Sequence, residues 1–257
     1  MSRDDAGAAA GASVDDDPAA DLPARPRLTR SSLFGALRRA IADFYFNSIR
    51  LVPANLIWGG GLLLLAWVAM VFGLLPALLL SPLLGIPLVG VYRIAGHVVR
   101  GEDAVLSDAF RAMRERILPA LLLADVVAWG GVLLAINVRL GLEAGTVVGW
   151  GFATFAGWGL VALVCISVVA WPITGDPDRR DLSFVTILRL AGYVVLARPV
   201  VMMVLTLVVV VLGIVSTIAF AAIVSISIAY LALVSSRIVL PEADWITERL
   251  AARDAAS

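Results

Sequence analysis

The sequence contains no lysine, one cysteine and one histidine, so all 20 basic side chains are arginines. A lone Cys165 excludes a disulfide framework, a cysteine-based metal site and a Cys-x-x-Cys redox pair. A lone His97 excludes a zinc site of the His-x-x-x-His type. The P-loop, Gly-x-Ser-x-Gly and His-Glu-x-x-His motifs are also missing. These absences favour a non-enzymatic protein that holds no metal and no other cofactor.

Charge of either sign is scarce, and apolar residues are abundant. Charged residues make up 16% of the chain and hydrophobic residues 61%, against roughly 25% and 45–50% in soluble domains. The mean hydropathy is +0.96. This composition predicts a polytopic membrane protein whose first partner is the lipid bilayer. The formal net charge is zero, which argues against a nucleic-acid partner.

The two ends of the chain differ in composition from its middle. Residues 1–30 are rich in alanine, aspartate and proline, and such a segment buries too little apolar surface to offset the entropy of ordering it. We therefore expect a disordered acidic tail at 1–30, a helical membrane domain at 31–241 and a polar tail at 242–257. No apolar stretch follows a basic start, so we expect the first spanning helix to direct insertion.

Long apolar runs predict an all-α membrane bundle of about six spanning helices. Four runs are separated by polar or proline-containing breaks, at 51–75, 76–95, 117–138 and 146–171. Residues 199–234 carry no charge and would form a helix about 54 Å long, against a hydrocarbon core of roughly 30 Å. We therefore expect this last run to be two legs, with a turn at 213–217.

Amphipathic helices precede the hairpins and suggest a weak internal repeat. The three helices are expected to begin at Ser32, Ser107 and Ser183. Each is followed by a proline and a hairpin. After a turn at 101–103, Ser107 is the expected cap of the second helix. Its apolar face is expected to hold Leu106, Phe110, Met113 and Ile117.

The arginines predict the topology. With six spans, Arg139 alone falls on the side opposite to the other arginines of the membrane domain. Because basic loops are retained in the cytoplasm, we expect both termini to be cytoplasmic and the protein to lie in the inner membrane of a bacterium.

Two features within the predicted spans have both functional and structural interpretations. Asp125 is the only acid well inside a span, where a charge costs a few kcal/mol. With Asn55 it either lines a ligand or proton path or braces the helices by hydrogen bonding. Gly141, Gly145 and Gly149 recur at every fourth residue, which favours close helix packing within the chain, with homo-oligomerisation as the alternative.

Residues 85–119 join two predicted hairpins and are the expected site for docking a cytoplasmic partner. His97 is expected to be a solvated interfacial histidine, although it has the chemistry of a pH sensor. The candidate docking residues are those with polar or aromatic side chains in this junction, namely Tyr92, Arg93, His97, Arg100, Glu102, Asp103, Phe110 and Arg114.

The junction also carries a family resemblance. The segments Gly90-Val91-Tyr92, Val99 to Asp103 and Ser107 to Arg111 resemble the YesL-like family of bacterial membrane proteins, with further likeness at 171–173 and 197–199. This family is a domain of unknown function, often encoded beside carbohydrate-uptake systems. The resemblance implies an accessory role at the membrane, with carbohydrate transporter subunits as partners, and it supplies no catalytic or ligand residues.

Two alternatives come from other classes of protein. Glu102, Ala104 and Asp108, followed by Ile117 to Pro119, resemble the coupling helix of importer permeases without its glycine. The chain would then be a transporter or permease subunit that couples to a separate ATPase through 102–119. A membrane enzyme for lipid-linked sugars is the third alternative, which the lack of paired acids or a nucleophile near the interface disfavours.

Overall fold

The computed structural model describes residues 30–218 and 226–256, and every regular element in these ranges is helical. The predicted all-α class is therefore confirmed. The elements run in the order α1 (Arg30–Phe46), α2 (Ser48–Phe72), α3 (Leu74–Leu80), η1 (Ser81–Leu84), α4 (Gly85–Arg100), α5 (Leu106–Glu115), α6 (Ile117–Glu143), α7 (Val147–Gly175), η2 (Pro177–Arg179), α8 (Phe184–Ala197), α9 (Pro199–Ile218) and α11 (Ile228–Ala256).

Within the described residues, five helices are long and apolar enough to cross a membrane, judged by length and composition. One of them is continuous through α3, η1 and α4. The turn expected at 213–217 is wrong, because α9 continues through these residues to Ile218. Gly213 is the only glycine in this stretch, which has no proline, and it alone does not end the helix. Part of the predicted sixth leg, 219–225, lies outside the described residues.

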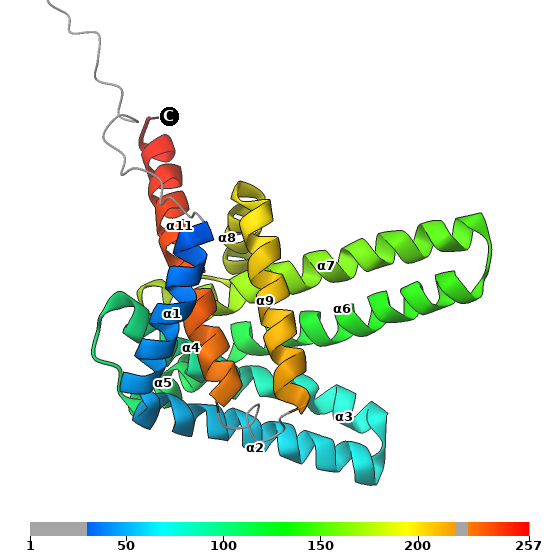
Figure 1. The fold of residues 1–257 in the computed structure, drawn as a ribbon, viewed down its shortest axis with the longest axis horizontal. Coiled ribbons are helices and arrows are strands. Elements are labelled where there is room, and N and C mark those ends of the chain that lie inside the picture. Colours follow the sequence, from blue (N-terminus) through cyan, green and yellow to red (C-terminus); the bar gives the residue numbers. More distant parts are fainter. Residues whose placement is uncertain (1–29, 219–225, 257) are drawn as a thin grey trace, which may run out of the picture.

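Four of the five spans form two hairpins whose open ends meet (Figure 1). α2 pairs with the α3 to α4 segment, and α6 pairs with α7. The hairpin tips turn at Gly73, with φ 92°, and at Gly145, with φ 62°, conformations that glycine adopts without steric cost. In Figure 1, α9 and α11 run across the direction of the α6–α7 hairpin. The open ends are covered by α1, α5 and the middle of α11.

Close packing of α6 on α7 depends on two of the three regularly spaced glycines. A Cβ atom on Gly141 would lie 2.6 Å from the carbonyl oxygen of Gly149, and one on Gly149 would lie 2.6 Å from that of Gly141. Gly145 is not in this contact, since it occupies the turn and a Cβ there would meet nothing. The glycine pattern thus contains one packing pair and one turn residue.

Replacing Gly141 by alanine is expected to destabilise the protein by roughly 1–2 kcal/mol, because the new methyl group overlaps the backbone of α7. The matched control is Gly131→Ala on the same helix, where a Cβ would meet nothing within 4 Å. Thermal unfolding in a mild detergent compares the two variants. A Gly141→Ala protein as stable as the control would contradict the packing role.

The start of α5 differs from the sequence-based expectation. The helix begins at Leu106, with extended Val105 as its N-cap residue. The Asp108 carboxylate accepts a hydrogen bond from the Val105 N–H at 2.9 Å, so Ser107 is not the cap. Ala109 and Ala112 form the buried face of α5, and Phe110 points outward. Of the expected apolar face, Leu106 and Met113 pack against the core, whereas Phe110 and Ile117 are exposed.

Candidate functional site

Charged side chains from four helices gather where the hairpin ends meet. We call this region the basic end, and it consists of residues 93–116, residues 176–182 and Asp244. α4 supplies its centre and packs against α5, α7, η2 and α11. The aromatic rings of Tyr92 and Trp171 stack beneath it, with centroids 6.2 Å apart. The basic end is therefore built on a packed core and not on a loose loop.

A buried ion-pair network ties the basic end together. Asp176, which follows the last residue of α7, is fully buried. Its carboxylate accepts two hydrogen bonds from Arg100, at 2.7 Å from both Nε and Nη2, and another from Arg179. Asp244 of α11 accepts hydrogen bonds from the same two arginines. Three segments distant in sequence are thus joined by one cluster of charges.

Arg116 fixes the chain that follows η2. Its side chain is buried, and Nη1 donates to the carbonyl oxygens of Arg180 and Leu182 at 2.5 and 3.0 Å. Removal from water lowers the pKa of the Arg116 guanidinium below its usual value. These bonds hold Arg180 above the end of α4, so Arg116 positions a side chain that belongs to the adjoining pocket.

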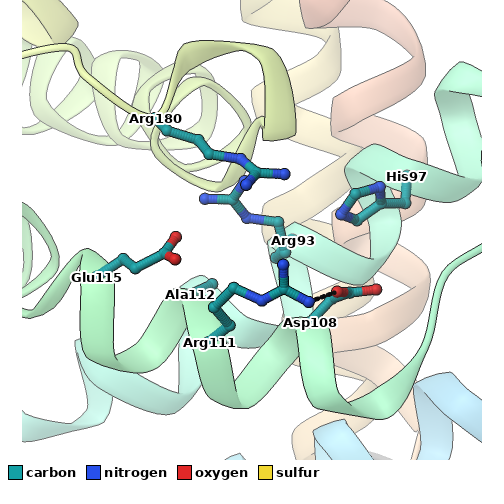
Figure 2. Close-up of a pocket in the computed structure, with 7 residues that line it drawn as sticks. All are labelled: Arg93, His97, Asp108, Arg111, Ala112, Glu115 and Arg180. Atoms are coloured by element: carbon teal, nitrogen blue, oxygen red, sulfur yellow. Dashed lines mark hydrogen bonds and ion pairs between the residues drawn. The ribbon is translucent and has the colours of Figure 1, made fainter.

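Next to the network lies a small pocket lined by arginines (Figure 2). Its volume is about 10 Å³, close to the space of one water molecule. Figure 2 shows the guanidinium groups of Arg93 and Arg180 facing each other, with Glu115 to one side and His97 to the other. Arg111 also lines the pocket. The pocket therefore offers mainly the hydrogen-bond donors of guanidinium groups.

Two carboxylates near the pocket already have partners. Asp108 pairs with Arg111 at 2.8 Å. Glu102 lies 2.6 Å from Nδ1 of His97. His97 is 8% exposed, so the expectation of a solvated histidine is wrong. Its ring is enclosed by the packing of α4 and anchors the turn that follows this helix.

The structure divides the candidate docking residues into two groups. Tyr92, Arg93 and His97 are buried, and Arg100 is held in the ion-pair network. These four cannot reach a partner protein. The remaining four are exposed on the turn and on α5, and they are Glu102, Asp103, Phe110 and Arg114.

Asn55 and Asp125 have different surroundings. Asn55 is fully buried on α2, and its Oδ1 accepts a hydrogen bond from the Ala229 N–H of α11 at 2.9 Å. Asp125 is exposed on α6. Asn55 therefore braces two helices, whereas Asp125 faces outward, and the two do not line one interior path.

The functional residues that sequence reasoning missed are the partners from distant segments. No sequence pattern pairs Asp176, Arg116 or Arg180 with the groups that they contact. Asp244 lies in what was taken for a polar tail, but it belongs to α11. The sequence does show opposite charges recurring at helix ends. It does not show which helix ends lie next to each other in the fold.

No protein-family model, curated protein or solved structure matches the chain. The resemblance to the YesL-like family therefore stays a prediction. Within the described ranges, no group of three or more histidine, cysteine, aspartate or glutamate side chains is placed to hold a metal ion.

Proposed function

We propose that the chain is a non-enzymatic, multi-pass membrane protein that acts as an accessory subunit in carbohydrate uptake or sensing. It binds its partner through the outward face of α5. The exposed side chains on this face are the observation that supports the proposal. Val105, Phe110 and Arg114 are exposed there, while Ala109 and Ala112 hold the helix against the bundle. Aromatic and arginine side chains are enriched in protein–protein interfaces.

The packing of α5 on the helices beneath it supports this role. α5 packs on α4, and α4 is joined to α7 and α11 through Arg100, Asp176 and Asp244. A helix held in this way presents its outer face with little loss of entropy on binding. The distribution of arginines supports a cytoplasmic location for this face, and the resemblance of 85–119 to the YesL-like family supports a carbohydrate transporter as the partner.

A second candidate function follows from the same helix. α5 is a short helix between two long apolar ones, which is the placement of a coupling helix in an importer permease. The partner that binds α5 would then be an ATPase subunit, and the chain would itself be a transporter subunit.

A photo-reactive amino acid at position 110 of the full chain, expressed in host cells, tests both functions. We expect a discrete cross-linked adduct that mass spectrometry identifies as a membrane subunit of a sugar transporter. An adduct with an ATPase subunit would support the permease instead. Val148, exposed at the far tip of the second hairpin, is the control position. No adduct at 110, or the same adduct at 148, would contradict docking through α5.

A further inference from the structure

The pocket in Figure 2 contains a buried cation, and two of its three donor nitrogens have no acceptor in the described part of the chain. Arg93 is 2% exposed. Its Nε and Nη2 atoms have no hydrogen-bond acceptor among the residues that the structure describes. Buried polar groups are almost always hydrogen-bonded, and a buried charge without a partner is costly. An acceptor from outside the described chain, either a water molecule or a ligand, would satisfy these donors.

The neighbouring charges leave the pocket positive. Arg93, Arg111 and Arg180 line it, and the carboxylates that line it are Asp108 and Glu115. Asp108 is occupied by Arg111 and by the Val105 N–H. Glu115 alone remains opposite Arg93 and Arg180, so one positive charge is in excess. His97, which also lines the pocket, is turned to Glu102.

Arg180 is held in place and not simply extended into solvent. Its Nε donates to the Pro177 carbonyl oxygen at 3.0 Å, and its own carbonyl oxygen accepts from Arg116. Two guanidinium groups that face each other repel, and the bonds from Arg180 to Pro177 and from Arg116 to Arg180 maintain this arrangement. Such a geometry is explained by an anion that binds between them.

We propose that Arg93, Arg111 and Arg180 form a binding site for a single phosphate group. Arginine forks match phosphate oxygens in bidentate geometry. The volume of about 10 Å³ admits one oxygen atom, and the exposed Arg111 and Arg180 side chains cover the remaining oxygens at the rim. A water molecule would satisfy the donors of Arg93 but would leave the excess charge.

Two sources of phosphate fit this position. The site lies near the end of the apolar helix Leu74–Arg100, where we expect phospholipid headgroups, and basic pockets between helix ends bind anionic lipids. A soluble phosphate compound from the aqueous side offers the same group. The site does not depend on partner docking, because Arg93 is buried beneath α5 and the docking residues are on its outer face.

The test uses the full chain, purified in a neutral detergent, with two probes. Inorganic phosphate represents the soluble source, and bicelles of phosphatidylcholine with or without phosphatidylglycerol represent the lipid source. We expect one probe to bind and to raise the thermal unfolding temperature. Arg93→Met, which keeps the side-chain volume, is expected to weaken binding about ten- to a hundredfold, and Arg93→Lys is expected to lie between. Arg189→Met, on the exposed surface of α8, is the control.

The outcome also identifies the source. A response to inorganic phosphate assigns a soluble ligand, and a response only to phosphatidylglycerol assigns a lipid. Binding of neither probe by the unmodified protein overturns the proposal, as does unchanged binding by Arg93→Met. If Arg93→Met does not fold, Arg180→Met decides, because that side chain is exposed and the fold does not depend on its burial. Unchanged binding by Arg180→Met would then overturn the proposal.

Discussion

Replacing Asp176 by asparagine is expected to lower the free energy of unfolding by about 3–5 kcal/mol, because it removes one partner of a buried charge cluster. The carboxylate is fully buried and accepts hydrogen bonds from Arg100 and Arg179. In the variant, two largely buried guanidinium groups keep only partly exposed partners, Asp244 for both and Asp178 for Arg100. Thermal unfolding of the full chain in a mild detergent measures the loss.

The matched control is Asp178→Asn. Asp178 also pairs with Arg100, at 2.8 Å, but its side chain is 56% exposed. Ion pairs at such positions contribute about 0–1 kcal/mol because water screens them. The same chemical change two residues away is therefore expected to have a small effect. Equal losses in the two variants would show that burial of Asp176 does not set the stability of the basic end.

Phosphate binding provides a second measurement on the same pair of variants. Asp176 joins α4 to the segment that carries Arg180, through Arg100 and Arg179. Loss of this joint is expected to loosen the alignment of Arg93 with Arg180 and to weaken binding in Asp176→Asn more than in Asp178→Asn.

The fold was largely predictable because apolar length and turn residues are local properties. The long apolar runs predicted the hairpins, and Gly101, with φ 75°, ends α4 where the turn was expected. The third amphipathic helix, α8, begins near Ser183 as expected, and the Ser183 hydroxyl accepts a hydrogen bond from the Thr186 N–H at 3.3 Å. Ser107 failed as a cap because the neighbouring Asp108 has the reach to accept the Val105 N–H.

The candidate site was predictable in position but not in partners. The junction at 85–119 does lie at the centre of the basic end. However, Arg100 meets Asp176 across 76 positions of sequence and Asp244 across 144. Periodicity and motif spacing contain no information on such pairs. The burial of His97 also depends on the packing of helices that are distant in sequence, so an interfacial histidine and an enclosed one look alike in sequence.

Replacing Gly175 by alanine is the second change with a large expected effect. Gly175 is the last residue of α7 and lies directly against α4. A Cβ there would be 2.5 Å from Cβ of Tyr92 and 2.8 Å from its carbonyl carbon. These atoms belong to a buried helix and have no freedom to rotate away. We expect a loss of about 3 kcal/mol, at the upper end of overpacking costs.

The position of Gly175 extends the consequence to the pocket. The same methyl group would lie 3.0 Å from the backbone nitrogen of Arg93, and the next residue is Asp176. To fit it, α7 and α4 must separate at the point where one supplies the ion-pair network and the other supplies Arg93. We therefore expect Gly175→Ala to weaken phosphate binding as well as to lower the unfolding temperature.

Gly157→Ala on the same helix, where a Cβ would meet nothing within 4 Å, is expected to leave binding unchanged and to alter stability by at most about 1 kcal/mol. A Gly175→Ala protein that matches this control would show that the contact between α4 and α7 does not position Arg93.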